Sequence, residues 1–329
     1  MNAVIRGTGG YAPEKVLTNA DFEKMVETSD EWIVSRTGIK ERRVVSNGET
    51  NSDLCYKAAQ RALEMANISP EDLDMIIVGT VTPDYFLPST AAVVQEKLGA
   101  FNSAAFDVAA ACAGFLHGLS IARGFILNGN VKRVLVIGSE VLSRITDYTD
   151  RSTCVLFGDG AGAVVVEADE NGVEGGSGVL SSYLKADGSK TELLWIPIGG
   201  SKDPITQQNV DARGRYIMMS GNEIYKLAVR AMCDAAQKTL DQAGIGTDEI
   251  SWLIPHQANI RIIEGVAKRL KIQDEKVYLN IEKYGNTSAA SVPIALDEAN
   301  RRGMLKKGDY ILMVAFGGGL TWGASLVRW

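Results

Sequence analysis

Short apolar segments rich in β-branched residues alternate along the chain with longer segments in which apolar residues recur every three or four positions. The short segments predict buried strands, and the longer ones predict helices that pack one face on a core. The predicted strands are Met75–Val78, Val134–Ile137, Ala163–Val166, Trp252–Ile254 and Ile311–Ala315. The predicted helices are Ser52–Ala66, Ser89–Leu98, Cys112–Leu127, Glu223–Ala243 and Asn259–Leu270. Strands and helices in this alternation predict an α/β fold.

Local signals add a helix start and a surface segment. Ser220 stands three residues before Glu223, which is the spacing of a capping box and predicts the start of a helix. The polar segment Lys185–Arg215 contains Gly199-Gly200 and Pro204 and predicts a long excursion over the surface.

Two pairs of predicted strands have nearly the same spacing. Val134 follows Ile76 by 58 residues (134 − 76), and Ile311 follows Trp252 by 59 (311 − 252). This similarity suggests two related halves, whose corresponding loops would lie side by side across a pseudo-two-fold axis. The glycine-rich stretch at 172–178 is the expected junction, which divides the chain into residues 1–174 and 175–329.

Composition narrows the class of protein. The chain has 329 residues, 46% of them hydrophobic, and a net charge of −6, so no global basic field attracts nucleic acid. Four scattered cysteines argue against disulfides and a zinc site, and two histidines exclude a multi-histidine metal site. The start of the chain lacks a signal-peptide pattern, and no apolar run reaches the roughly 18 residues of a membrane span. We expect a cytoplasmic protein that neither spans a membrane nor binds nucleic acid.

Cys112 is the first candidate for chemistry. It lies between a strand-like apolar segment and an apolar helix-like segment. A thiol at such a junction meets free backbone N–H groups and the positive end of a helix dipole, and both favour the thiolate. Most cysteines with apolar neighbours simply pack in a core, so other segments must decide between the two interpretations.

Three further segments offer partners for the thiol. His256 follows a predicted strand and precedes a helix, Asn286 stands in a Gly-Asn turn, and Gly317–Gly319 follow the strand Ile311–Ala315. A glycine run lets backbone N–H groups approach and stabilise an oxyanion. Ligands of open α/β sheets bind at the carboxyl ends of strands, so we expect these groups to converge on Cys112.

The segments around Cys112, His256, Asn286 and Gly317–Gly319 resemble those of the β-ketoacyl-[acyl-carrier-protein] synthase III family of bacterial fatty-acid synthesis. Similarity covers essentially the whole chain, and Ser29–Ile39 is a further specific segment. The resemblance implies a thiolase-like fold, in which duplicated α/β halves form a layered αβαβα core, and usually a homodimer. The nucleophilic cysteine would belong to the N-terminal half, and the histidine and asparagine to the C-terminal half.

The resemblance also implies a reaction in two steps. Cys112 attacks an acyl-CoA primer, which gives an acyl-enzyme and free CoA. Malonyl-acyl carrier protein then loses CO2, and His256 Nε2 and Asn286 Nδ2 stabilise the enolate that attacks the acyl-enzyme. Backbone N–H groups of Cys112 and Gly318 would hold the oxyanion, and the helix rather than a base would activate the thiol. CoA thioester is a substrate in this scheme, and no cofactor or metal is expected.

The resemblance assigns two binding surfaces. Residues expected to contact CoA are Thr28, Trp32, Arg36, Thr37, Arg151, Asn222 and Asn259. At about 100° per residue, Arg261 and Lys268 share one face of the helix after His256, with an apolar stripe opposite. Because carrier proteins are acidic, we expect docking at Gln257, Ala258, Asn259, Ile260, Arg261, Lys268 and Arg269, with a contribution from Lys226.

The acyl pocket is expected to involve Leu87, Leu142 and Phe316. Leu87 matches a family position that reaches across the dimer, where the best-known short-chain-selective members have a bulkier phenylalanine. A leucine there favours a longer or branched primer. Tyr225 and the excursion Lys185–Arg215 depart from the shortest members, which bears on CoA contacts and lid behaviour and not on the chemistry.

Other features and other functions were weighed against this hypothesis. Phe157–Ala163 superficially resembles a dinucleotide loop, but it precedes a strand and lacks the spacing, so we interpret it as a structural turn. Cys55, Cys154 and Cys233 are expected in the core, and His117 is expected either in the core or facing a partner. A condensing enzyme or acyltransferase of secondary metabolism and a Cys/His/Asn hydrolase stay open as alternatives, as does the identity of the primer. A redox protein would need a second nearby cysteine or a cofactor motif, and a non-catalytic binding role would leave the reactive side chains unexplained.

Overall fold

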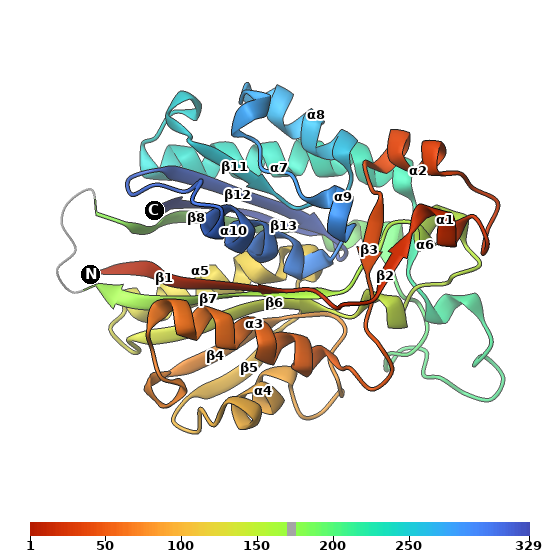
Figure 1. The fold of residues 1–329 in the computed structure, drawn as a ribbon, viewed down its shortest axis with the longest axis horizontal. Helices are drawn as coiled ribbons and strands as arrows, with labels where there is room; N and C mark the ends of the chain where they lie inside the picture. Colours follow the sequence, from red (N-terminus) through yellow and green to blue (C-terminus); the bar gives the residue numbers. More distant parts are fainter. Residues whose placement is uncertain (170–175) are drawn as a thin grey trace.

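A computed structural model describes residues 1–169 and 176–329 and arranges them in five alternating layers (Figure 1). Helices α3 (Asn51–Ala66) and α4 (Thr90–Leu98) cover the outer face of the first large sheet. Helices α5 (Gly114–Leu127) and α10 (Ser291–Arg301) lie between the two large sheets of the described part. Helices α7 (Gly221–Ala243) and α8 (Ile260–Leu270) cover the outer face of the second sheet. This is the layered αβαβα core of the thiolase-like fold.

The two large sheets mix parallel and antiparallel strands. In the first, β6, β4 and β5 run parallel, and β7 pairs antiparallel with both β1 and β6. Its order is β1 (Asn2–Tyr11), β7 (Gly160–Asp169), β6 (Arg133–Glu140), β4 (Met75–Gly79) and β5 (Ala104–Val108). In the second, only β11 and β12 are parallel. Its order is β11 (Trp252–Pro255), β12 (Tyr310–Gly317), β13 (Thr321–Arg328) and β8 (Gly178–Ala186).

Smaller elements surround one end of these sheets. They include strands β2 (Val16–Thr18), β3 (Glu41–Arg43), β9 (Leu194–Trp195) and β10 (Met218–Met219). They also include helices α1 (Asn19–Phe22), α2 (Asp30–Thr37), α6 (Arg151–Cys154) and α9 (Ile281–Tyr284). As Figure 1 shows, α1, α2, α6, β2 and β3 gather at the end opposite the two termini, where the cavity described below opens between the halves.

The two halves repeat the same arrangement, as the strand spacing predicted. Met75 lies opposite Val134 in one parallel pair and Trp252 opposite Ile311 in the other, so both offsets are 59 residues (134 − 75 and 311 − 252). The central helices also begin alike. A 3₁₀ turn at Ala111–Ala113 leads into α5, and one at Ser288–Ala290 leads into α10. Each turn starts at a residue with left-handed backbone, Ala111 with φ 44° and Ser288 with φ 49°.

The sequence placed every predicted strand and helix correctly in kind, with differences at the ends. The helix predicted from Cys112 begins as a 3₁₀ turn and becomes α-helical at Gly114. Ser220 does stand at the start of α7, so the predicted helix start is confirmed, although its side chain makes no capping hydrogen bond with the described residues. The predicted junction at 174/175 lies outside the described residues, and the division into 1–174 and 175–329 stays a prediction.

One hydrophobic core lies between the sheets, where apolar side chains of α5 and α10 meet both inner faces. Leu116, Leu119 and Ile126 of α5 and Leu296 of α10 are fully buried there. Each such side chain contributes about 1.5–3 kcal/mol relative to an exposed one. This packing fixes the starts of α5 and α10, and with them the two turns that carry the site.

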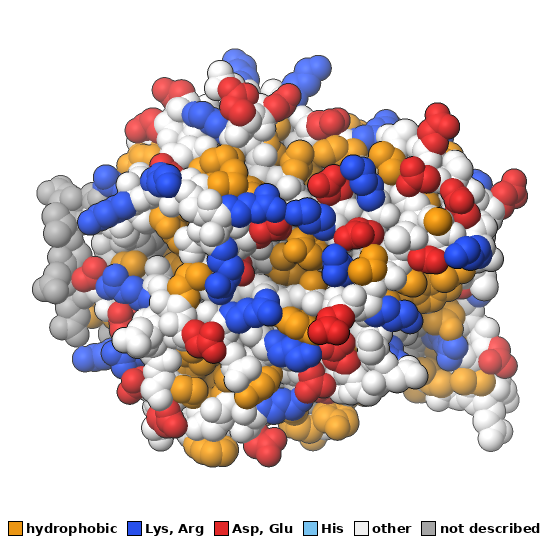
Figure 2. All heavy atoms as spheres, viewed as in Figure 1, with side chains coloured by type: hydrophobic (Ala, Val, Ile, Leu, Met, Phe, Trp, Pro, Cys, Tyr) orange, Lys and Arg blue, Asp and Glu red, His pale blue; other side chains and the backbone are white. Residues whose placement is uncertain are grey.

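The surface fits the modest net charge. Figure 2 shows acidic and basic side chains interspersed over the face drawn, with no large area of one sign. No helix in the described ranges is long and apolar enough to span a membrane.

Candidate active site

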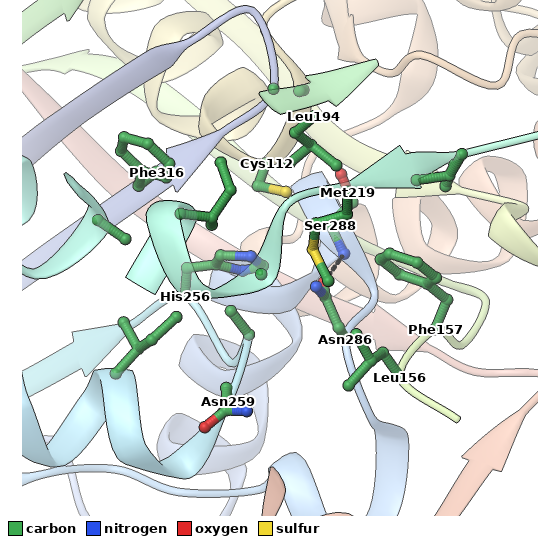
Figure 3. Close-up of a pocket in the computed structure, with 18 of the residues that line it drawn as sticks. Cys112, Leu156, Phe157, Leu194, Met219, His256, Asn259, Asn286, Ser288 and Phe316 are labelled. Atoms are coloured by element: carbon green, nitrogen blue, oxygen red, sulfur yellow. Dashed lines mark hydrogen bonds between the residues drawn. The ribbon is translucent and has the colours of Figure 1, made fainter. Parts of the chain in front are cut away.

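A cavity of about 940 Å³ opens between the two halves and brings the predicted reactive side chains together. Cys112 comes from the N-terminal half, and His256, Asn286 and Phe316 come from the C-terminal half (Figure 3). Ser288 lies among them. The convergence predicted from strand ends is confirmed.

The backbone around Cys112 is held by the glycine run. A Cβ on Gly317 would lie 2.5 Å from the Cys112 nitrogen, so only glycine permits this approach. Thr321 Oγ1 donates to the Ala110 carbonyl at 2.7 Å and ties the end of the run to the segment before Cys112. Gly318, the next residue of the run, lines the same cavity as Cys112.

The electrostatic expectation for Cys112 was wrong. Burial raises the pKa of its thiol to about 12, and the negative charge of Glu140 adds to the increase. The Ser288 hydroxyl and the backbone N–H of Cys112 lower the pKa, but by less. The cavity wall is mostly apolar, and loss of hydration outweighs the hydrogen bonds at the start of the helix. Burial therefore opposes the thiolate that the backbone N–H of Cys112 favours.

His256 is neutral in this site. It lies just beyond β11, is buried, and is fixed by its backbone N–H, which donates to the Val314 carbonyl at 2.8 Å. Burial lowers the pKa of the imidazole to about 3. Nδ1 is buried and has no hydrogen-bond partner within the described residues. A neutral imidazole donates one hydrogen bond, so His256 is suited to stabilise an oxyanion through Nε2–H and is a weak base.

Asn286 is oriented by the turn that carries it. Its backbone N–H donates to the Leu156 carbonyl at 2.9 Å, and its carbonyl accepts from the Gly158 N–H at 3.0 Å. Its Oδ1 accepts a hydrogen bond from the Ser288 N–H at 2.9 Å, drawn as a dashed line in Figure 3. With Oδ1 occupied, Nδ2 remains as the donor for a ligand, as predicted.

Trp32 and Arg36 line the cavity, and Arg151 packs against Trp32 without lining it. The guanidinium carbons of Arg36 and Arg151 each lie 5.0 Å from the centre of the Trp32 ring, a distance typical of cation–π contacts. Arg151 also donates to the Glu27 carbonyl at 2.9 Å. Trp and Arg side chains can both stack on a planar base, and the arginines can pair with phosphate.

Of the other four residues predicted to contact CoA, three line the cavity and one does not. Asn222 and Asn259 line the cavity, and so does Thr37. The Thr37 hydroxyl is already used within the chain, since it donates to the Ile33 carbonyl at 2.7 Å. Thr28 does not line the cavity, although its buried Oγ1 has no partner in the described part of the chain.

Helix α8 presents the predicted basic face. Arg261, Lys268 and Arg269 are exposed, whereas the opposite stripe is buried and consists of Ile262, Ile263, Val266, Ala267 and Leu270. Lys226 and Arg261 also line the cavity mouth. The expected docking segment is partly different, because Ala258 lines the cavity and Ile260 packs on Gly38.

Gln257 was wrongly assigned to docking. Its side chain is 1% exposed, so no partner can reach it. Nε2 donates to the carbonyls of Pro255 and Tyr278, at 2.9 and 3.1 Å, and Oε1 accepts from the N–H groups of Asn280 and Ile281, at 3.1 and 3.2 Å. Gln257 joins the His256 loop to the segment that leads to Asn286.

Two of the three predicted acyl-pocket residues line the cavity, and the third does not. Leu142 and Phe316 are buried and line the cavity. Leu87 is 88% exposed and does not line the cavity of its own chain.

Several residues at the cavity were missed in the sequence. Leu194, within the predicted excursion, and Met219, just after it, line the cavity through the short β9–β10 pair, although much of the segment between them is exposed. Ser288 and Glu140 were not singled out either. Ser288 is only two residues from Asn286, which is a signal that could have identified it, whereas Glu140 gave none.

The segment Phe157–Ala163, His117 and the other three cysteines were assigned no chemistry in the sequence analysis, and their contacts in the structure are with the chain itself. Phe157 forms an isolated bridge with Asn286, and Gly158 bonds to the same residue, so this segment is a turn packed beside the site. His117 Nδ1 lies 2.9 Å from the Ala113 carbonyl within its own helix. Cys55, Cys154 and Cys233 are free and buried.

Comparisons with known proteins agree with this geometry. Family models described as 3-oxoacyl-[acyl-carrier-protein (ACP)] synthase III and its C-terminal part match residues 106–188 and 240–329. The chain is 57% identical over 327 residues to a beta-ketoacyl-[acyl-carrier-protein] synthase III of Caldanaerobacter subterraneus, covering 99% of this chain and 98% of the relative. The crystal structure of the corresponding synthase from Aquifex aeolicus matches with a TM-score of 0.91 and 52% identity, over 99% of this chain and 100% of that one. The priming beta-ketosynthase of the R1128 polyketide pathway also has a TM-score of 0.91, at 34% identity, with 99% and 96% coverage.

Proposed function

The chain belongs to the 3-oxoacyl-[acyl-carrier-protein] synthase III family, and on this premise we propose that Cys112, His256 and Asn286 carry its condensation. The enzyme is an acyltransferase. It condenses an acyl-CoA primer with malonyl-acyl carrier protein to 3-oxoacyl-acyl carrier protein, CoA and CO2, the step that initiates type II fatty-acid synthesis. The observation that supports the residue assignment is the convergence of a thiol, a neutral imidazole and an amide donor on one cavity.

The first half-reaction loads the primer. The Cys112 sulfur attacks the thioester carbonyl, and the tetrahedral oxyanion accepts hydrogen bonds from the N–H groups of Cys112 and Gly318. The intermediate then expels CoA and leaves the acyl group on Cys112. Close packing of Gly317 on Cys112 supports this placement of the two N–H donors.

The second half-reaction consumes malonyl-acyl carrier protein. Loss of CO2 leaves an enolate, whose oxygen accepts hydrogen bonds from His256 Nε2 and Asn286 Nδ2. Such donors are worth most in a dry site, where they need not reorganise during the reaction. The enolate carbon then attacks the acyl group on Cys112. These steps use only the two substrates, so we propose that the reaction needs no cofactor or metal.

CoA and the carrier protein would approach the same cavity mouth. Trp32, Arg36 and Arg151 would hold the adenine and phosphates, while Asn222 and Asn259 face the pantetheine arm. Thr37 would contribute surface more than its hydroxyl, and Thr28 would contribute only after a local rearrangement. The exposed basic face of Arg261, Lys268 and Arg269 would dock the acidic carrier protein beside this mouth.

The working form would be a homodimer in the cytoplasm. Strand β5 is at the edge of its sheet and is only partly buried, and the neighbouring segment exposes Tyr85, Phe86 and Leu87 at 59%, 95% and 88%. A second copy of the chain would cover these apolar side chains and bring Leu87 to the partner's acyl pocket. Free, unpaired cysteines fit a reducing compartment.

Mass spectrometry of the intact protein tests the assignment. After incubation with a panel of acyl-CoAs, the protein should gain the mass of one acyl group, which also identifies the primer. Cys112→Ala should gain none. Addition of malonyl-carrier protein should then release CO2 and yield a 3-oxoacyl thioester. Release of free acid without malonyl substrate would instead identify a hydrolase.

A further inference from the structure

Glu140 is a buried carboxylate that the condensation scheme leaves unused. It ends strand β6 and is completely inaccessible to solvent. Its Oε2 accepts hydrogen bonds from Thr80 Oγ1 at 3.1 Å and Thr82 Oγ1 at 2.5 Å, and the Val81 N–H also donates to it at 3.1 Å. No Lys, Arg or His of the described residues forms a hydrogen bond or an ion pair with it. Since an unpaired buried carboxylate is costly, its presence calls for an explanation.

Ser288 connects this carboxylate to the nucleophile. Its Oγ donates to Glu140 Oε1 at 3.2 Å. The same hydroxyl interacts with the Cys112 thiol, whose pKa it lowers, and both residues line the cavity (Figure 3). The left-handed backbone of Ser288, with φ 49°, is a strained conformation that directs the residue to this place. Ser288 thus interacts with the thiol and with the carboxylate.

We propose that Ser288 and Glu140 form a proton relay that deprotonates Cys112 when the acyl-CoA binds and returns the proton to the departing CoA sulfur. This inference rests on the function proposed above and adds two residues to its first half-reaction. Ser288 would be a catalytic residue, because it touches the reacting sulfur, and Glu140 would act through it.

The proton and electron movements balance. As the Cys112 sulfur attacks, its proton passes to Ser288 Oγ while the Ser288 hydroxyl proton passes to Glu140 Oε1. The S–C bond to the acyl group forms, and the tetrahedral intermediate then breaks the bond to the CoA sulfur. Glu140 returns its proton to Ser288 Oγ, and the Ser288 hydroxyl proton passes to the CoA thiolate. Both residues end in their starting states.

The surroundings favour Glu140 over His256 as the proton acceptor. Burial lowers the pKa of His256 to about 3, so the imidazole holds a proton poorly at neutral pH. Burial raises the pKa of Glu140 to about 7, which suits a group that accepts and returns a proton near neutrality. The other titratable groups that interact with Glu140 are the thiols of Cys112 and Cys55, and burial raises the pKa of both. Neither thiol titrates near pH 7.

The test measures single-turnover acylation of Cys112 by the primer as a function of pH, with intact mass as the readout. In the unmodified enzyme the rate should rise with pH through about 7, because Glu140 must be ionised to accept the proton. Ser288→Ala and Glu140→Gln should each acylate about 10²-fold more slowly at pH 7. In both variants the rate should keep rising well above pH 7, as the thiol ionises without help. Glu140→Asp keeps an ionisable proton acceptor, so its acylation rate should again rise with pH near neutrality.

Controls separate the relay from a structural effect. Ser181→Ala removes a buried hydroxyl outside the cavity that donates to the Thr239 carbonyl, and it should keep the unmodified pH profile. Glu140→Gln places an amide against several donors, so its folding must be checked by thermal unfolding. Ser288→Ala leaves the bonds of Glu140 to Thr80, Val81 and Thr82 in place and can decide the question alone. An unchanged acylation rate and pH profile in Ser288→Ala would overturn the relay, whereas failure of the unmodified enzyme to be acylated by any acyl-CoA would overturn the proposed function itself.

Discussion

Three titratable side chains of the site have pKa values displaced toward their neutral forms. Burial raises the pKa of Cys112 to about 12 and of Glu140 to about 7, and lowers that of His256 to about 3. Apart from Glu140, which is partly ionised near neutral pH, these side chains are therefore uncharged until the reaction creates charge on sulfur, on the enolate and on the oxyanion. In such a dry environment each well-placed donor contributes more than it would in water.

Asn286 gives a test of enolate stabilisation at the residue scale. Asn286→Ala removes the Nδ2 donor and should slow decarboxylation of malonyl-carrier protein by about 10²–10³-fold. Acylation of Cys112 should persist, since that step does not use the amide. Rates of CO2 release and of acylation, measured separately, check the split. Asn286→Asp is the matched variant, because its carboxylate can still accept from the Ser288 N–H. Normal condensation by either variant would refute the role.

Gln257 gives a test of stability at the same scale. Gln257→Leu leaves the buried N–H groups of Asn280 and Ile281 without an acceptor. Buried unsatisfied groups are costly, so the free energy of unfolding should fall by about 3 kcal/mol. Urea denaturation measures this change. The KM for malonyl-carrier protein in the folded fraction should stay the same, and a selective rise in that KM would restore the docking role that burial excludes.

The positions of residues in the site were predictable from the sequence where the signal is local. Cys112, His256 and Asn286 each follow a strand or a turn signal, and strand ends meet at a site. The burial of Gln257 and the contact between Glu140 and Ser288 depend on chain segments far apart in the sequence. The pKa of Cys112 was mispredicted for the same reason, since desolvation comes from the whole cavity wall.

Among the elements, helix α8 was the most predictable, because its 3.6-residue periodicity is strong. Its apolar face is buried and its basic face is exposed, as the sequence pattern predicted. The excursion Lys185–Arg215 was the least predictable. Its polar sequence correctly indicated exposure, but the apolar Leu194 near its start packs over the cavity. The N-terminus of α7 shows that capping-box spacing permits a cap without producing one.

The basic face of α8 can be tested by charge reversal. Lys268→Glu should raise the KM for malonyl-carrier protein about fivefold, because it replaces attraction with repulsion at an exposed site. Lys268 does not line the cavity, so acylation by acyl-CoA should be unaffected. Steady-state kinetics at low ionic strength measure both. Lys307→Glu, an exposed reversal outside α8, is the control. Equal effects of Lys268→Glu on both substrates would refute docking at this face.

At the scale of the whole molecule, strand β5 lies at the edge of its sheet, and no further strand of the described chain pairs with that edge. An exposed strand edge beside large apolar side chains is a liability unless it is covered. The layered architecture was predictable from strand spacing and the family resemblance together. The partner across β5 was inferred from resemblance, because a sequence pattern does not distinguish an edge strand from a central one.

Phe86→Glu tests this edge. Phe86 is 95% exposed in the single chain, so a charge there should not disturb its folding. In a dimer the same charge would be buried and unpaired, and the protein should become monomeric with reduced condensation activity. Sedimentation velocity and steady-state assays measure the two effects. A dimer of unchanged stability in this variant would place the interface elsewhere.

The matching left-handed residues before α5 and α10 bear on how the enzyme arose. Ala111–Gly114 and Ser288–Ser291 occupy equivalent places in the two halves, so Cys112 corresponds to Ala289. An ancestor assembled from two identical half-length chains would have carried the same side chain at both positions. Fusion of the two genes would have let the copies diverge independently. In the present chain only one of the two positions carries a thiol, and the half that lacks it contributes His256 and Asn286 to the cavity.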